Sequence, residues 1–126
     1  TLCKTKGIGA YWALFTNVLD TIQLNRMVKE LDNSETFNRK FRVPSLSADH
    51  PKYKENGRYW QGGIWPGTNY MVIQGLVKKG YRKLAREIAL NHYNEVLEVY
   101  KNTGTFWEYY HPENYKGWPI PHVPGP

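Results

Sequence analysis

The chain has few residues that could form disulfide bonds or bind a metal. It contains one cysteine, Cys3, which excludes an internal disulfide framework and fits reducing and secreted environments alike. The four histidines lie too far apart for the spacing of a zinc site, at His50, His92, His111 and His122. We therefore expect no metal site and no cofactor, and the cysteine count indicates no particular compartment.

The chain also lacks long apolar runs and clustered charge. None of its apolar stretches approaches the roughly 20 residues of a membrane span. Lys and Arg number 17 against 11 acidic residues, a net charge of +6, but the cations are spread along the chain in short pairs such as Lys78-Lys79. Phosphate backbones favour clustered cations. We therefore expect neither a membrane nor a nucleic acid as partner.

Aromatic residues are abundant instead. They make up 15% of the 126 residues, with 5 Trp and 10 Tyr, a load that favours contact surfaces for carbohydrate or protein. The length suits one domain with a modest core. The chain opens on Thr1 rather than Met and shows no signal-peptide pattern, which indicates a piece of something longer.

The first half of the chain predicts two helices of different character. Residues 10–18 are apolar nearly all round, which predicts a helix buried on every side. After Asp20, which can cap a helix, apolar residues follow at i, i+3, i+4 and i+7 and predict an amphipathic outer helix. These apolar positions are Leu24, Met27, Val28 and Leu31.

The same order then repeats. Pro66 suits a first helical position, residues 69–77 are apolar on most faces, and Gly80 suits the left-handed end of that helix. A long amphipathic helix ending near Gly104 follows, with His92 on its apolar stripe and Glu95 outside it. We expect helices near 9–18, 21–32, 67–79 and 81–102, with irregular structure over 33–65. This is an all-α, two-layer helical repeat, an α-toroid or solenoid, and its long loop favours function.

Two stretches carry candidate chemistry. Thr105-Phe106-Trp107-Glu108-Tyr109-Tyr110 sets one carboxylate among four aromatic side chains. Aromatic faces stack on pyranose rings and apolar surroundings disfavour a charged carboxylate, so Glu108 is the candidate catalytic group. The alternative is a short core strand with Glu108 facing solvent.

The second stretch, Tyr59-Trp60-Gln61-Gly62-Gly63-Ile64-Trp65-Pro66-Gly67-Thr68-Asn69-Tyr70, feeds the N-terminus of an apolar helix. Two glycines let backbone approach a ligand, and tryptophans and amides offer stacking and hydrogen bonds. The alternative is a glycine turn pinned by Trp65 under the helix.

Together these stretches resemble the C-terminal part of the catalytic domain of glycoside hydrolases of families 63 and 37, the processing α-glucosidase-like and trehalase-like enzymes. Residues 41–49, Phe-Arg-Val-Pro-Ser-Leu-Ser-Ala-Asp, are similar to the preceding loop of bacterial members. The likeness covers about 9–115, so residues 1–126 form one C-terminal portion of a domain. It implies a fragment of an (α/α)6 barrel, with two inner/outer helix pairs and long loops.

The resemblance also implies a reaction. It predicts inverting hydrolysis of an α-glucoside-type bond, with Glu108 as the general base that activates water. Gln61 departs from a position that is often Arg in these families, which leaves its contact open. The residues expected to bind the sugar come from both stretches: Trp60, Gln61, Gly63, Trp65, Asn69, Trp107 and Tyr110.

The family's general acid, an upstream aspartate, has no matching motif here. Asp49 could face the cavity, but no pattern marks it as the acid. We therefore expect an incomplete glycosidase whose substrate is an oligosaccharide or disaccharide, and whose inner helices pack on the remainder of the catalytic domain or self-associate. The alternative is a non-catalytic helical module that binds carbohydrate or protein.

Overall fold

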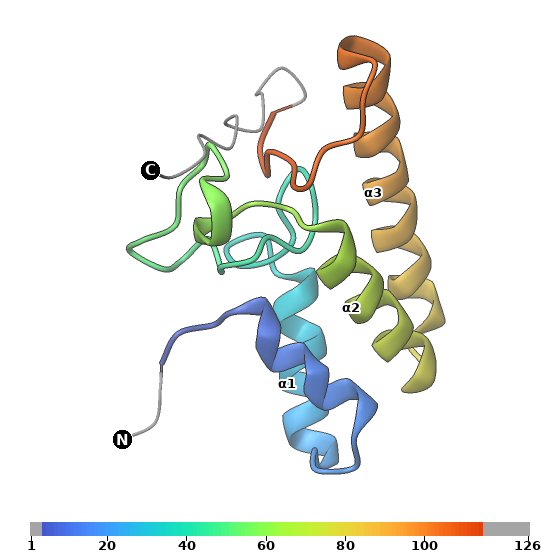
Figure 1. The fold of residues 1–126 in the computed structure, drawn as a ribbon. Coiled ribbons are helices and arrows are strands. Elements are labelled where there is room, and N and C mark those ends of the chain that lie inside the picture. Colours follow the sequence, from blue (N-terminus) through green and yellow to red (C-terminus); the bar gives the residue numbers. More distant parts are fainter. Residues whose placement is uncertain (1–3, 115–126) are drawn as a thin grey trace.

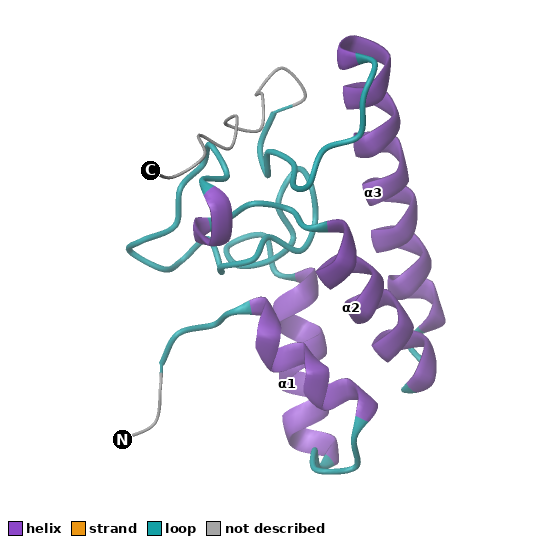
Figure 2. Cartoon of the chain, in the orientation of Figure 1, coloured by secondary structure: helices purple, strands orange, loops and turns teal. Residues whose placement is uncertain are grey.

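Helix α2 (Pro66–Lys78) packs against the 3₁₀ helix η1 (Ile8–Phe15) and against helix α3 (Arg82–Thr103) (Figure 1). A computed structural model describes residues 4–114, and its other elements are α1 (Thr21–Asp32) and the short 3₁₀ helix η2 (Tyr59–Gln61). These described residues contain no strand, only two isolated bridges (Figure 2). The predicted all-α class is confirmed.

Local signals set the helix ends. The Asp20 carboxylate accepts the Gln23 N–H at 2.7 Å, and the Gln23 side chain accepts the Asp20 N–H at 3.0 Å, a reciprocal cap on α1. Pro66 is the first residue of α2. Gly80 and Gly104 take left-handed φ values of 89° and 72° after α2 and α3. The expected positions of all four helices are thus confirmed, as is the irregular stretch between α1 and α2, apart from η2.

The first helix differs from expectation in type and in burial. It is a 3₁₀ helix, with three residues per turn, so Ile8, Tyr11 and Leu14 fall on one side and are buried. Trp12 lies off that line and is 62% exposed. The prediction of a helix buried on every side is therefore wrong for the described chain, because only one side of η1 faces α2 and α1.

The long loops gather at one end of the helices, where α2 begins and α3 ends (Figure 1). Their centre is the buried stretch 41–47, whose backbone is paired in several directions. Ser45 donates to the Gly63 carbonyl and its own carbonyl accepts from Ile8, both at 3.0 Å. Phe41 donates to the Pro112 carbonyl at 2.9 Å. Buried irregular backbone needs such partners, and here they join η1 to both candidate loops.

Two buried clusters hold the molecule together. The larger one joins η1, α1, α2 and α3 around Leu14, Leu31, Val72 and Ile88. The smaller one lies under the loops and consists of Phe41, Ile64, Val99 and Tyr110.

Several large apolar side chains remain exposed on the described surface, among them Trp12, Tyr70, Tyr93 and Phe106. Such surface fits the expectation of packing against further protein, which stays a prediction. Among the described residues, none of the helices combines the length and the apolarity that crossing a membrane requires.

The close approach of α2 to η1 predicts opposite effects of two glycine substitutions. A Cβ on Gly75 would lie 2.7 Å from Leu14 Cβ, whereas a Cβ on Gly67 meets nothing within 4 Å. Gly75→Ala should lower the free energy of unfolding by about 1–3 kcal/mol through overpacking. Gly67→Ala should raise it by up to about 1 kcal/mol through helix propensity. Urea unfolding of both variants checks this, and a stabilising Gly75→Ala would contradict the packing.

Candidate active site

A two-hydrogen-bond bridge brings the two candidate stretches together. Ile64 donates to the Tyr110 carbonyl at 2.9 Å, and Tyr110 donates to the Ile64 carbonyl at 2.8 Å. The Ile64 side of this bridge leads into Trp65 and the start of α2, and the Tyr110 side follows shortly after Glu108. Residues far apart in the sequence therefore form one site.

Aromatic rings line this junction. Trp60 stacks on Trp65 with centroids 4.2 Å apart and planes at 6°, and Trp65 stacks on Tyr109 at 5.0 Å and 24°. The Tyr59 ring meets all three edge-on. Trp65 is 8% exposed and Trp60 is 47% exposed, so the stack offers Trp60 to solvent. Tyr109 was missed from the sequence, although it lies beside Glu108 in the candidate stretch.

The backbone around this stack is unusual. Gly57, Gly62 and also Tyr59 take positive φ, at 68°, 141° and 49°. A left-handed tyrosine is costly and such residues cluster at functional sites. A Cβ on Gly63 would lie 2.6 Å from the Tyr59 carbonyl oxygen, so glycine is needed there for packing.

Glu108 lies on a turn that its neighbours close. The Trp107 N–H donates to the Tyr110 hydroxyl at 3.1 Å, and the Trp107 indole N–H donates to Thr103 Oγ1 at 3.1 Å. Trp107 is half-buried, and Glu108 itself is exposed. Glu108 is thus open to solvent on a turn whose next residue, Tyr109, belongs to the ring stack.

The other predicted binding residues divide by accessibility. Trp60, Gln61 and Trp107 are exposed or half-buried and can touch a ligand as they stand, whereas Gly63, Trp65, Asn69 and Tyr110 are buried. Asn69 donates from its amide to the Arg42 carbonyl at 3.2 Å. Among the described groups, Asn69 Oδ1 and Trp65 Nε1 have no hydrogen-bond partner. The buried residues hold the loop, and their contact with a sugar remains a prediction.

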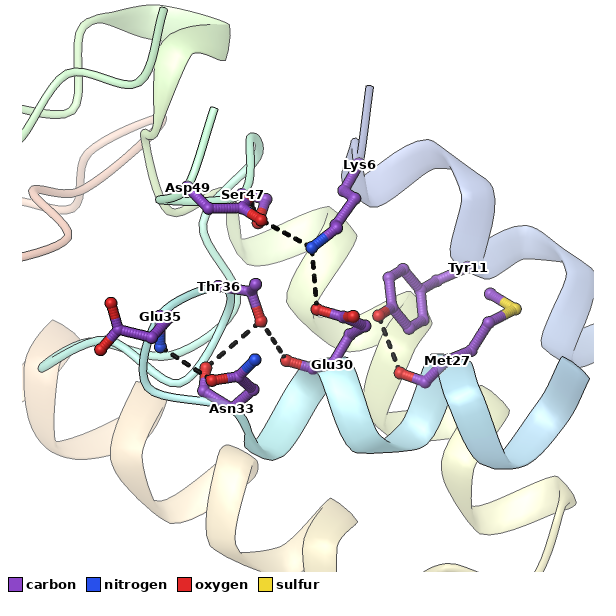
Figure 3. A network of polar contacts seen from close by, with 9 residues as sticks. All are labelled: Lys6, Tyr11, Met27, Glu30, Asn33, Glu35, Thr36, Ser47 and Asp49. Atoms are coloured by element: carbon purple, nitrogen blue, oxygen red, sulfur yellow. Dashed lines mark hydrogen bonds and ion pairs between the residues drawn. The ribbon is translucent and has the colours of Figure 1, made fainter. Parts of the chain in front are cut away.

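Asp49 belongs to a different network (Figure 3). Its carboxylate accepts from Lys6 Nζ at 2.6 Å and from Ser47 Oγ at 2.6 Å, and Lys6 also pairs with Glu30 at 3.3 Å. These hydrogen bonds, led by that from Lys6, lower the pKa of Asp49. A carboxyl that is held ionised is a poor proton donor, so Asp49 is unsuited to be the general acid.

The prediction that Glu95 lies on the outer face of α3 is wrong. It is 1% exposed, although the sequence analysis places it outside the apolar stripe. Ile88, Glu95 and Val99 are seven and four residues apart and share one buried side, a spacing that could have revealed it. His92 Nδ1 lies 3.4 Å from Glu95 Oε2.

Burial sets the ionisation of this pair. It raises the pKa of Glu95 well above its usual value and lowers the pKa of His92 to about 4. Neither Glu95 oxygen nor His92 Nδ1 has a hydrogen-bond partner among the described residues. His92 is therefore not the satisfied core histidine that its position on the stripe favours. No group of three or more His, Cys, Asp or Glu that could hold a metal occurs in residues 4–114.

Comparison with known proteins shows to which family the chain belongs. Residues 1–117 match the model of the mannosylglycerate hydrolase MGH1-like glycoside hydrolase domain. The chain belongs to this family. Mannosylglycerate hydrolase MGH1 of Selaginella moellendorffii is 40% identical over 70 residues, which cover 56% of this chain and 13% of that protein. A probable mannosyl-oligosaccharide glucosidase of Schizosaccharomyces pombe is 27% identical over 108 residues, 78% of this chain and 13% of the relative.

Solved structures of this family share the fold. The GH63 mannosylglycerate hydrolase from Thermus thermophilus in complex with glucose aligns with a TM-score of 0.74 at 25% identity, covering 91% of this chain and 27% of that one. The expected family 63 likeness and (α/α)6 barrel fold are confirmed, and the described helices are two hairpins of such a barrel. The chain spans 13% of the length of both the Selaginella and the Schizosaccharomyces relatives. The likeness to family 37 stays a prediction.

The buried Glu95–His92 pair predicts how stability varies with pH. Because the pKa of Glu95 is raised in the folded state, its protonated form stabilises the fold at low pH, and this contribution is lost as pH rises through the folded-state pKa. The lowered pKa of His92 acts oppositely, costing stability as pH falls from about 6.5 to about 4. Because His92 is present in both proteins, a comparison of the parent with Glu95→Gln isolates the contribution of Glu95.

Glu95→Gln should therefore gain in melting temperature over the parent chain as pH rises from 4.5, the ordinary pKa of a glutamate, to 9. Thermal unfolding of both proteins across this range checks the prediction. An equal melting-temperature difference at both ends of the range would contradict a buried, neutral Glu95.

Proposed function

We propose that this chain forms the general-base side of a glycosidase active site. The observation that carries the proposal is the Ile64–Tyr110 bridge, which sets the Glu108 turn against the Trp60–Trp65 stack. A carboxylate beside an accessible aromatic ring is what hydrolysis of a glycosidic bond needs: the ring binds the sugar face, and the carboxylate acts on water. Membership of a glycoside hydrolase family supports the same reaction.

In the proposed mechanism Glu108 is the general base of an inverting hydrolysis. Its carboxylate removes a proton from water as the water attacks the anomeric carbon from the face opposite the leaving group. Solvent exposure of Glu108 supports this role, because the base must reach a water molecule. The water's oxygen forms the new C–O bond while the glycosidic C–O bond breaks.

The general acid comes from outside residues 1–126 in this proposal. Asp49 is held ionised by Lys6, and an inverting pair needs a second carboxyl roughly 6.5–9.5 Å from the first. Relatives several times longer support a longer enzyme that supplies this group. The exposed apolar side chains of η1 and α2 would pack on that remainder.

Two substrate classes are supported, and in both the proposed base of the hydrolysis is Glu108. An α-glucoside, in a disaccharide or oligosaccharide, follows from the family resemblance and from relatives named as glucosidases. Mannosylglycerate follows from the matching family model and from relatives named as its hydrolases. Parallel assays of the full-length protein on mannosylglycerate and on α-glucosides separate them.

Glu108→Gln tests the proposed base. It keeps the size of the side chain and most of its hydrogen bonding but removes the proton acceptor, so turnover should fall on the order of 10²–10⁴-fold while substrate still binds. Steady-state kinetics of the full-length protein measure this, and proton NMR of the first-formed sugar anomer checks inversion. More than about a tenth of parental activity, well above that range, would remove Glu108 from the mechanism.

If Glu108→Gln keeps its sugar affinity and the parent protein shows no turnover, the protein is instead a non-catalytic carbohydrate-binding module. Glu113→Gln is a matched control. Its carboxylate is paired with Arg39 at 2.6 Å and with the Tyr53 hydroxyl at 2.7 Å, so it is not the proposed base, and this variant should keep parental turnover.

Trp60→Ala should affect binding rather than turnover. Removing the exposed ring deletes the stacking surface, which raises KM and leaves kcat nearly unchanged if the ring holds substrate and transition state equally. Trp12→Ala removes another exposed ring, from η1, and should change neither constant. Equal KM values for Trp60→Ala and the parent would show that the sugar does not stack on Trp60.

A further inference from the structure

The buried Glu95 carboxyl has no evident structural reason to be there. Among the described residues both of its oxygens lack a hydrogen-bond partner, and only His92 Nδ1 comes close, at 3.4 Å. Removing such a group from water without a partner costs stability, and replacement by an apolar side chain is often stabilising. Groups that break this rule in a folded protein call for a separate explanation, and functional sites are where they concentrate.

His92 links this carboxyl to the Glu108 turn. Its ring meets the Tyr110 ring edge-on, with centroids 6.2 Å apart and planes at 89°. Tyr110 then acts at both ends of the turn: its hydroxyl accepts the Trp107 N–H at 3.1 Å, and its backbone pairs with Ile64. Glu108 lies between Trp107 and Tyr110, the two residues joined by that hydroxyl hydrogen bond.

On the side of α3 the turn is held by the hydrogen bond from the Trp107 indole to Thr103, by Val99 in the cluster with Tyr110, and by His92. A groove of about 450 Å³ opens there and is lined by His92, Val96, Phe106, Trp107 and Tyr110. Tyr110 is buried, and His92, which also lines this groove, is the residue of α3 whose ring meets it edge-on.

We propose that Glu95 and His92 are positioning residues that orient the Glu108 turn through Tyr110. The Glu95 carboxyl lies 3.4 Å from His92 Nδ1, so a small rotation of a protonated carboxyl completes a hydrogen bond to Nδ1. That bond fixes the imidazole tautomer with its N–H on Nε2 and holds the ring against Tyr110. The pair is thus neutral and tolerates burial. This inference rests on the proposed role of Glu108 as general base.

Glu95→Leu in the full-length protein tests the inference. It should keep or raise the melting temperature, because an unpaired buried polar group is lost, and lower kcat on the order of 10²-fold, the usual cost of a misplacement of about 1 Å. KM should change little. Glu95→Gln should restore most of kcat, because its amide N–H still donates to His92. Glu98→Leu, on an exposed glutamate paired with Lys101 at 2.7 Å, is the matched control and should leave kcat unchanged.

Three results would overturn the inference. The first is a parental kcat in Glu95→Leu, and the second is an equal loss of kcat in Glu95→Leu and Glu95→Gln. The third is a loss of kcat in Glu95→Leu that is explained by a lowered melting temperature of that variant. If Glu95→Leu does not fold, His92→Phe takes its place with the same expectation, since it keeps the ring and removes the acceptor.

Glu108→Gln, measured alongside, separates the positioning role from the proposed base. If it is inactive while Glu95→Leu has parental kcat, the general base stands and the positioning role fails. If Glu108→Gln is active, the proposed base fails and the positioning role fails with it.

Discussion

Two backbone hydrogen bonds, between Ile64 and Tyr110, are the interaction on which the candidate site depends. They join the loop that begins α2 to the loop that follows α3, and every other contact of the site is arranged around them. Trp65 stacks on Tyr109 immediately beyond the bridge, and Tyr110 fixes the turn that carries Glu108. Without the bridge, the carboxylate and the exposed Trp60 ring would belong to separate loops.

The bridge in turn depends on buried irregular backbone. The stretch 41–47 crosses beneath both loops and satisfies its polar groups by pairing with η1, with Gly63 and with Pro112. This arrangement is strained in places, since Val43 is fully buried with a φ of 68°, a conformation that β-branched residues rarely adopt. Val43 packs in the larger cluster with Leu14 and Val72, which offsets that strain. The smaller cluster of Phe41 and Ile64 holds the loops. The helices supply a frame, and the chemistry lies in segments without regular structure.

Much of the frame could be predicted from the sequence because its signals are local. Asp20, Pro66, Gly80 and Gly104 mark helix ends through capping and backbone geometry that act over a few residues. The two candidate stretches could be recognised as one site only through family resemblance, since no local rule pairs Ile64 with Tyr110.

What the sequence did not reveal is set by tertiary contacts. The stretch 10–18 is apolar nearly all round and so predicts burial on every side, but η1 winds with three residues per turn and buries only one side. Glu95 lies off the apolar stripe that runs through His92, which predicts exposure, yet it is buried on the same side as Val99. Glutamates are seldom buried, so local sequence favours the wrong answer here. The Lys6–Asp49 pair joins residues far apart in the chain, and only the fold shows that Asp49 is held ionised.

The most direct test of the central claim is a crystal structure of the full-length protein with a sugar bound. The account predicts a pyranose ring stacked on Trp60, and a Glu108 carboxylate within hydrogen-bond distance of a water molecule on the face of the anomeric carbon opposite the leaving group. A sugar bound away from Trp60, or a Glu108 side chain directed away from the bound ring, would contradict it.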